Sequence, residues 1–317
     1  MAQEKRMHFP KIRHAEIRSK LTVSQLLAEL RGCTMGAGRI ARAADIAEEM
    51  IKDRECTVFL GLAGAMVPGG MRSIIVGMLK QGWVDVLVTT GATLTHDLAE
   101  SLGHTHLLGS EHADDAKLRA HGYDRMFDSL MPNEAYEDIE ELVGKNFGKL
   151  KNCRTIREFL SALGSCVPKG DSSILRTCYE KNIPIFCPAI SDSGLGLVVW
   201  GQLAQGKSVN AGGFDDLKEM LDIAWRCKKA GVIYIGGGVP KNHIQQAMQI
   251  APNAASYGVQ ITMDRPEHGG SSGAELREGI SWGKMNPKGH FVDVICDATI
   301  ALPLLYGALV DRIKKRG

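Results

Sequence analysis

The chain lacks any apolar run long enough to suggest a membrane span. Of its 317 residues 44% are hydrophobic, yet no window approaches about eighteen apolar residues in a row. The first stretch, "MAQEKRMHFPKIRHAEIRSK", is charged throughout and contains no apolar core of the kind that secretion signals carry. We therefore expect a cytoplasmic protein with no membrane partner.

The chain also lacks a dominant charge and any paired cysteine motif. It has 38 basic and 36 acidic side chains, a formal net charge of +2, which gives no overall attraction to nucleic acid or to an anionic membrane. Eight cysteines are scattered without a C-x-x-C pair, and several lie in apolar segments such as "PIFCPA". We expect reduced thiols in the core, and a small molecule or a specific protein surface as the partner.

The sequence consists mainly of short apolar segments that alternate with segments of helical periodicity. Apolar residues recur at helical spacing in 69–83 and 214–231, for example. The segments that we predict to be strands are residues 57–62, 84–89, 183–189, 231–237, 257–262 and 292–298. Near-continuous apolar strands between helices are typical of a parallel sheet that is covered on both faces. The sequence predicts an α/β fold with a doubly wound, mostly parallel sheet.

We predict two parts in the chain. Residues 1–25 form an N-terminal extension that docks on the body or on another subunit, and Thr22 is a plausible helix N-cap within it. Residues 26–317 form a single catalytic domain, in which the helix-rich region 110–182 is a cap or insertion. No linker that would divide this domain is evident.

Glycine-rich segments follow three of the predicted strands, at 61–70, 90–97 and 236–242, and Asp297 ends the last strand. Loops at the carboxyl ends of parallel strands are where open α/β sheets bind ligands. Together these loops suit a dinucleotide, whose pyrophosphate needs close backbone approach. None of them has the G-x-G-x-x-G spacing or a P-loop lysine, and each alone is more often just a tight turn, so only the three together favour a dinucleotide.

The histidine-rich segment "HTHLLGSEHADD" (104–115) contains possible metal ligands in His104, His106 and His112. A polar loop explains it more simply, so we predict no metal site. The acids Glu137, Asp138, Glu140 and Glu141 are expected on a solvated helix face.

The segment "SSGAELREGISWGK" (271–284) ends on Lys284, directly after Trp282 and Gly283 and six residues beyond Glu278. An ordinary lysine, with a pKa of about 10.4, is a free amine in only about one molecule in 2,500 at pH 7. A tryptophan wall and tight glycine turns could enclose the amine for attack on an imine carbon, and Glu278 could bind a cation. A solvated surface lysine is the alternative.

This segment resembles the deoxyhypusine synthase family, and the spacing of Ser-Gly-Ala, Glu and Ser-Trp-Gly-Lys is specific to it. The resemblance covers nearly the whole chain and is closer to archaeal or bacterial members than to eukaryotic ones. The other segments that carry it are "VFLGLAG" (58–64), "VDVLVTTGA" (84–92), "CPAISDSGLG" (187–196), "IGGGVPKNHI" (235–244) and "DATIALPLL" (297–305).

The resemblance implies NAD-dependent transfer of the aminobutyl group of spermidine to a lysine of the hypusine-carrying translation factor. It also implies a homotetramer with sites between subunits. Lys284 would be the nucleophile that captures the four-carbon imine. The substrate-binding residues implied are Glu278, Trp282, Ser271, Ser272, His96 and Asn242. The NAD-binding residues implied are Gly64, Ala65, Met66, Val67, Pro68, Thr90, Gly91, Ala92, Asp192, Gly237, Met263, Asp264, Asp297 and Ala298.

Several acids of the familiar eukaryotic pattern are replaced. Thr95 and His96 stand where that pattern has glutamates, Leu197 and Ser271 where it has aspartates, and Asn242 where it has a histidine. The uncompensated loss of two carboxylates would weaken spermidine binding by roughly 10² to 10⁴-fold. Three functions stay open: deoxyhypusine synthesis; the same lysine chemistry with agmatine as donor or a small amine as acceptor; and a nonenzymatic NAD-binding relative.

Overall fold

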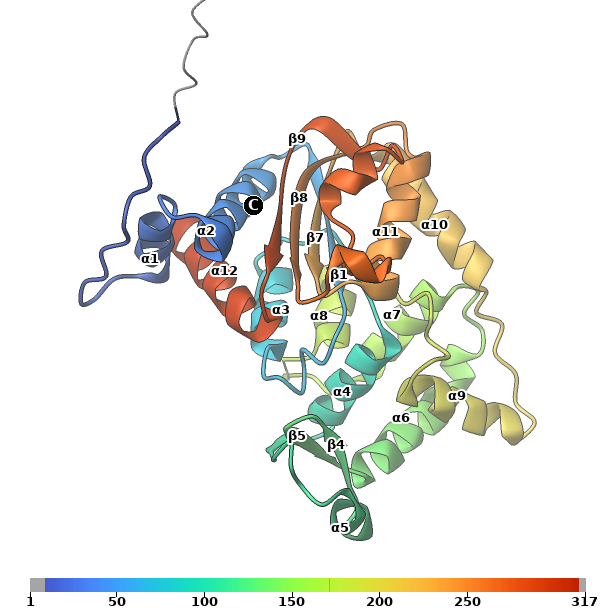
Figure 1. Ribbon diagram of the computed structural model, residues 1–317. Coiled ribbons are helices and arrows are strands. Elements are labelled where there is room, and N and C mark those ends of the chain that lie inside the picture. Colours follow the sequence, from blue (N-terminus) through green and yellow to red (C-terminus); the bar gives the residue numbers. More distant parts are fainter. Residues whose placement is uncertain (1–8, 171, 314–317) are drawn as a thin grey trace, which may run out of the picture.

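The computed structural model describes residues 9–170 and 172–313, and a six-stranded parallel sheet forms its centre (Figure 1). The strand order is β6-β2-β1-β7-β8-β9, and every neighbouring pair is parallel. The strands are β1 (Cys56–Leu62), β2 (Val86–Thr89), β6 (Ile185–Phe186), β7 (Lys229–Ile235), β8 (Ala255–Thr262) and β9 (Met285–Ile295). The predicted α/β class is confirmed.

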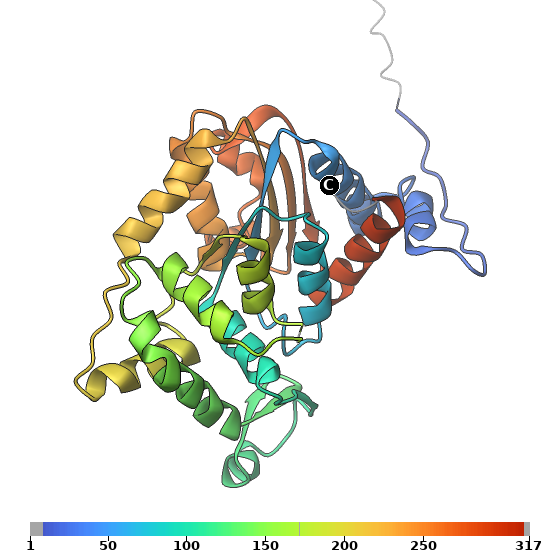
Figure 2. The same cartoon turned by 180° about the vertical axis from the view of Figure 1, so that it is seen from behind.

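Helices cover both faces of this sheet. Figure 2 shows the first and last helices lying side by side on one face. That face carries α1 (Val23–Leu30), α2 (Met35–Lys52), α3 (Arg72–Lys80), α8 (Ile174–Lys181) and α12 (Ala298–Arg312). The other carries α10 (Gly213–Arg226), α11 (Gly238–Ile250) and the 3₁₀ turns η1 (Pro266–His268) and η2 (Leu276–Ile280), while α7 (Ile156–Cys166) packs beside β6.

The apolar core consists of one layer on each face of the sheet. Along β1, Val58, Leu60 and Leu62 enter the layer beneath α2 and α12, whereas Phe59 enters the layer beneath α10 and α11. Successive strand residues point to opposite faces, so a strand that is buried on both faces must be apolar at nearly every position. This is why the strand-like segments of the sequence are almost continuously hydrophobic.

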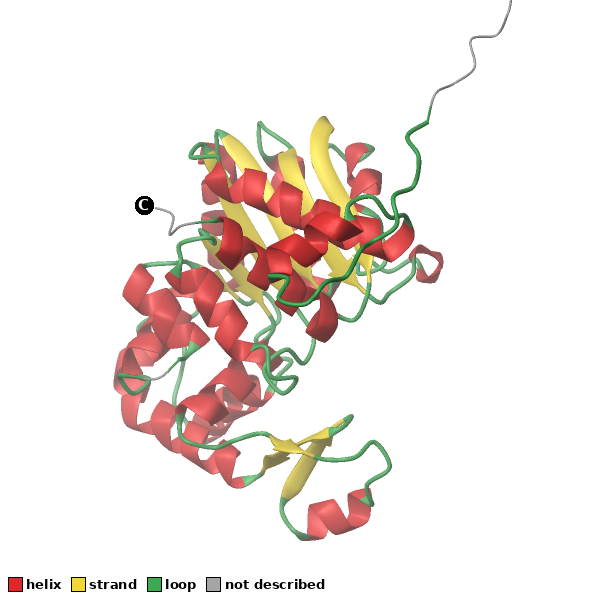
Figure 3. Cartoon of the chain, turned by 90° about the vertical axis from the view of Figure 1, so that its left-hand side faces the viewer, coloured by secondary structure: helices red, strands yellow, loops and turns green. Residues whose placement is uncertain are grey.

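A second layer of structure lies beyond the carboxyl ends of the strands (Figure 3). It contains α4 (Gly91–Ser101), α5 (Asp115–Ala120), α6 (Glu134–Leu150), α9 (Gly194–Ala204) and an antiparallel sheet in the order β3-β5-β4, formed by β3 (Leu107–Leu108), β4 (Tyr123–Met126) and β5 (Ser129–Pro132). The region predicted to be helix-rich therefore also holds a hairpin. Its turn uses Phe127 at φ 56°, a conformation that glycine normally adopts, so no glycine marks this turn in the sequence.

The predicted limits differ most from the structure at two strands. The strand predicted at 183–189 is only two residues long, because Pro184 and Pro188 flank it and cannot donate to a ladder. The last strand begins seven residues before its predicted start, and its polar first half pairs with β8 through a register shift at Ala255/Tyr257.

At the N-terminal side, the predicted cap is confirmed. The Thr22 hydroxyl accepts from the Gln25 N–H, and the Gln25 side chain accepts from the Thr22 N–H. The proposed boundary at residue 25 falls inside α1, and residues 1–8 lie outside the described part, so the domain division stays a prediction. All eight cysteines are free thiols, and no helix among the described residues is long and apolar enough to cross a bilayer.

Candidate active site

The central sheet has a topological switch point between β1 and β7. From β1 the chain proceeds outward to β2 and β6, whereas from β7 it proceeds in the opposite direction to β8 and β9. The last residues of the two central strands, Leu62 and Ile235, are paired. The loops that follow them therefore diverge from one point at the carboxyl edge, which is where open α/β sheets bind their ligands.

Glycines let these two loops approach each other closely. Gly236 has φ 75°, and a Cβ there would lie 3.1 Å from the carbonyl oxygen of Ala63. Gly64 has φ 81° and is exposed at the same edge. Neither glycine adds a side chain of its own at this edge, which allows the close backbone approach that a pyrophosphate requires.

All the residues predicted to bind the cofactor lie in or beside the loops at this carboxyl edge. Asp192, Asp264 and Asp297 are exposed acids that could meet ribose hydroxyls, although Asp297 also caps α12 through the Thr299 N–H at 2.7 Å. Others can offer only backbone groups because their side chains are buried; these are Met66, Val67 and Ala298. The remaining residues of this set are Gly64, Ala65, Pro68, Thr90, Gly91, Ala92, Gly237 and Met263.

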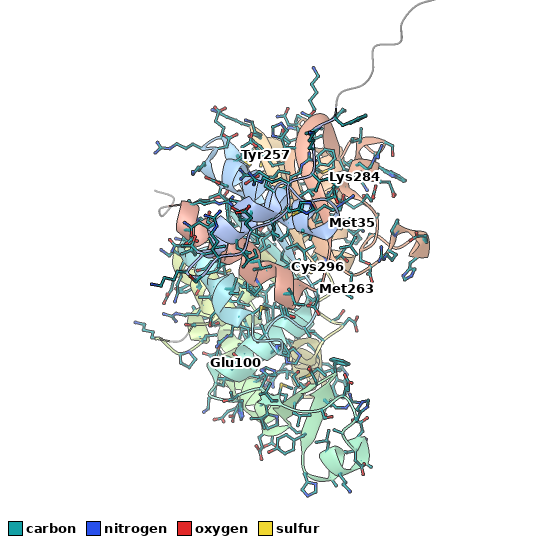
Figure 4. The ribbon with its side chains drawn as sticks, turned by 60° about the vertical axis from the view of Figure 1, so that its left-hand side comes forward. Met35, Glu100, Tyr257, Met263, Lys284 and Cys296 are labelled. Carbon is teal, nitrogen blue, oxygen red and sulfur yellow. The ribbon has the colours of Figure 1, made fainter. Side chains whose placement is uncertain are left out.

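Lys284 lies at the opposite end of the sheet from these loops. It directly precedes β9, and Figure 4 shows it at the other end from Met263 and Cys296. Gly283, at φ 71°, turns the chain so that the Lys284 N–H donates to the Gly279 carbonyl at 2.8 Å. The Lys284 ammonium then lies 5.0 Å from the ring centroid of Trp282, within cation–π range.

A pocket of about 320 Å³ separates α11 from the connection between β8 and β9, and Lys284 lines it. Four predicted substrate residues, Glu278, Trp282, Ser271 and Asn242, also line it. The other lining residues are Lys241, Gln245, Gln246, Gly269, Gly270, Ala274, Glu275, Leu276 and Gly279.

Four polar lining residues were missed from the sequence. Gln245 and Gln246 lie one helical turn beyond Lys241 and Asn242, so the helical period could have found them. Glu275 lies three residues before Glu278, where a 3₁₀ turn brings side chains to the same side. Lys241 lies inside a quoted motif, but nothing in the motif reveals that its side chain is buried.

The pocket and the carboxyl edge are joined by one tight contact. A Cβ on Gly237 would lie 2.3 Å from the Cα and Cβ of Ser272, so this loop and this turn touch directly. The Ser272 hydroxyl donates to Asp264, and the Ser271 hydroxyl donates to the Gly238 carbonyl at 3.4 Å. Ser272 therefore lies behind the pocket, where it connects the turn to the edge loops.

His96, the remaining predicted substrate residue, does not line this pocket. It lies in α4, where its Nδ1 is hydrogen-bonded to Nε2 of His106 at 3.0 Å, and His106 contacts Glu100 at 2.8 Å. Burial, followed by the neighbouring His106, lowers the pKa of His96 to about 4. The imidazole is neutral at physiological pH, and its substrate role stays a prediction.

The two other replaced positions near α4 and α9 have different environments. The Thr95 hydroxyl donates to the Gly91 carbonyl and accepts from the Leu195 N–H at 2.9 Å, so it fixes the start of α9. Leu197 is 66% exposed and, with Trp200, lines an apolar groove of about 440 Å³.

The histidine segment forms separate pairs. His104 contacts Asp138 at 2.7 Å, and the Asp138 side chain is still 48% exposed on its helix face, whereas His112 is exposed. Within residues 9–170 and 172–313, no three His, Cys, Asp or Glu side chains gather as a metal site would require.

Comparison with known proteins places this architecture in a family. The family model for deoxyhypusine synthase matches residues 25–309. The chain belongs to the deoxyhypusine synthase family. Among curated relatives, "Probable deoxyhypusine synthase 1" of Methanosarcina mazei is 44% identical over 306 residues, 96% of each chain. The protein of that name from Archaeoglobus fulgidus is 42% identical and covers 94% of this chain and 97% of its own.

Solved structures support the same fold. A deoxyhypusine synthase homologue from Entamoeba histolytica superimposes with a TM-score of 0.63 at 17% identity, over 94% of this chain and 96% of its own. A LOR/SDH protein from Methanococcus maripaludis reaches 0.50 at 17% identity, over 98% of this chain and 74% of its own. Membership of the deoxyhypusine synthase family implies an enzyme of the transferase class.

Proposed function

We propose that this chain transfers the 4-aminobutyl group of spermidine, through an imine on Lys284, to a lysine of the hypusine-carrying translation factor. The observation that carries the proposal is the pocket that contains the Lys284 amine, the Trp282 ring and two carboxylates, Glu275 and Glu278. An amine for capture and acids for cationic groups are the two elements that a polyamine reaction requires.

The carboxyl edge fits NAD as the cofactor. The close approach of Gly236 to Ala63 leaves an open backbone cradle, and the exposed acids Asp192, Asp264 and Asp297 are placed to meet ribose hydroxyls. When bound, NAD supplies the hydride acceptor for oxidation of the donor amine and the hydride that is returned at the end.

Within the pocket, Lys284 would attack the imine carbon of the oxidised donor, and 1,3-diaminopropane would leave. Glu278, with Glu275 beside it, would hold the cationic end of the four-carbon unit. The Trp282 ring would cover the amine and limit the access of water. The acceptor lysine would then displace Lys284 from the same carbon.

The proposed assembly is a homotetramer in the cytoplasm. Leu197, Trp200 and Leu203 on α9 are 66, 64 and 41% exposed, and a partner subunit would cover such side chains. The free thiols of all eight cysteines suit a reducing compartment.

A second candidate keeps the lysine chemistry but changes the amines. Ser271 and Asn242 line the pocket with neutral side chains where acid and histidine are expected for spermidine. Agmatine as donor, or a small amine as acceptor, suits a pocket with fewer charges.

One experiment separates these candidates. The protein is incubated with NAD and labelled spermidine, agmatine or putrescine, with and without the translation factor, and then reduced with borohydride and mapped by mass spectrometry. A four-carbon adduct on Lys284 from spermidine, with transfer to the factor, is expected. A guanidinobutyl adduct or transfer to a free amine favours the second candidate, and the absence of any adduct despite NAD binding would overturn both in favour of a nonenzymatic relative.

A further inference from the structure

Lys241 is a second amine in the Lys284 pocket, and its surroundings are unusual for a lysine. It lies in the first turn of α11 and is 4% exposed, whereas buried lysines normally require a charged partner. The hydrogen bonds recorded for its Nζ go to two backbone carbonyls, those of Ser271 at 2.5 Å and Ala274 at 2.6 Å. Lys241 is also one of the residues that line the cavity, together with Glu278 and Lys284.

Two carbonyl partners can accept hydrogen bonds from this amine in either protonation state, more strongly from the ammonium. An ammonium has three N–H donors, and a neutral amine has two donors and one lone pair. The bonds to Ser271 and Ala274 use two donors in both states. The third position on the nitrogen carries a proton or a lone pair, so Lys241 can release and regain a proton while both hydrogen bonds stay in place.

Burial is the main cause of an unusual pKa at Lys241. Burial and the nearby Lys284 charge lower this pKa, Asp293 of β9 and Glu278 of η2 raise it, and the net result is about 8. Glu275 also lines the pocket. About one Lys241 in ten is therefore a free amine at pH 7, compared with about one in 2,500 for an ordinary lysine.

The neighbouring neutral polar side chains cannot release and regain a proton in this way. Asn242, next in the helix, presents an amide, and Ser271 presents a hydroxyl that donates to the Gly238 carbonyl. Neither side chain accepts and releases a proton near pH 7.

We propose that Lys241 is the proton-transfer group of this pocket, which takes the proton from the Lys284 nitrogen as that nitrogen captures the imine carbon and gives it to the departing amine. This rests on the proposed function. A C–N bond forms to Lys284 and the C–N bond to the leaving amine breaks, with its electron pair and the proton going to the leaving nitrogen. Lys241 ends in its starting state, and no oxidant is consumed.

The test compares Lys241→Arg and Lys241→Met with the wild type and with a control, Lys288→Arg, at an exposed lysine. Borohydride trapping measures the rate of Lys284 adduct formation in a single turnover from pH 6.5 to 9.5. Arginine keeps the charge and the donors to both carbonyls but does not deprotonate. We expect Lys241→Arg to bind NAD as the wild type does, to form the adduct at least about 100-fold more slowly, and to lose the wild-type inflection near pH 8. Lys241→Met should be at least as slow.

A second arm needs neither NAD nor turnover. Butanal and cyanoborohydride label Lys284 through the same loss of a proton from its nitrogen, and mass mapping gives the rate. Lys241→Arg should slow this labelling, whereas Lys288→Arg should not. Wild-type rates in Lys241→Arg would overturn the proposal, and if this variant does not fold, a wild-type labelling rate with no inflection near pH 8 would overturn it instead. A wild type that is labelled by butanal but by no amine with NAD would refute the proposed function, whereas slower butanal labelling of Lys241→Arg would still support Lys241 as the proton acceptor for Lys284.

Discussion

The Lys284 pocket and the α4–α9 region both contain polar side chains at positions where the family carries substrate residues, but they use them differently. In α4, Thr95 holds the start of α9, and Asp97 accepts from Arg72, Ser173 and the backbone at the start of α8. In the pocket, Glu275, Glu278 and Lys284 face a cavity. Polar groups that the protein itself satisfies serve stability, and those that face open space are available to a ligand.

The largest effect should come from Lys284→Arg. A guanidinium stays protonated and cannot form the imine, so transfer should fall by about 10⁴-fold or more. Borohydride trapping and mass mapping measure the loss, and NAD binding should be unchanged because Lys284 is not among the residues proposed to bind the cofactor. An adduct on another lysine of the variant would show that the nucleophile is wrongly assigned.

Asp97→Asn, in the α4–α9 region, should instead lower the free energy of unfolding. The Asp97 carboxylate is fully buried, and it accepts from the Arg72 Nε at 2.9 Å and from the Ser173 hydroxyl at 2.8 Å. Breaking one partner of a buried charge network costs about 3 to 5 kcal/mol in unfolding free energy. Urea unfolding measures it, with the exposed Asp128→Asn as control. An equal loss of stability in both variants would contradict this difference.

Glu278→Gln, in the Lys284 pocket, should have a smaller effect, which is a loss of affinity for the amine. Loss of a charge-assisted hydrogen bond, about 1.5 to 3 kcal/mol, should weaken amine binding by roughly 10- to 100-fold while leaving stability unchanged. Calorimetric titration of the amine identified by trapping measures it. Glu267→Gln, on the same connection but in η1, should bind as the wild type does. Normal affinity in Glu278→Gln would assign the cationic end to Glu275.

His96 should affect stability in acid and leave amine binding unchanged. Its pKa is about 4 in the folded protein and about 6.5 when unfolded, so the unfolded state binds more protons below pH 6.5. Relative to His96→Gln, the wild type should lose roughly 1 to 2 kcal/mol of unfolding free energy between pH 7 and pH 5, with the exposed His112→Gln as control. A change in amine affinity would restore His96 to the substrate site.

The sequence was sufficient to predict the sheet, the loops at its carboxyl edge and the Lys284 segment. Each of these depends on a local pattern: apolar strands, glycine turns and a specific motif. It was not sufficient for Lys241, because the burial of that side chain depends on the turn at 271–274, which is thirty residues away along the chain. The predicted length of β6 was too great because Pro184 and Pro188 limit that strand. The turn at Phe127 was not predicted because no glycine marks it. Long-range contacts, rather than element types, mark the limit of prediction.

The pocket draws its lining from only two stretches of the chain, 241–246 and 269–284. On the proposed function, the residues that recognise the amine would therefore come from two short segments that lie outside the buried strands of the sheet. Substrate range in this architecture can then diverge by replacement of these segments while the cofactor loops and the central fold are inherited intact.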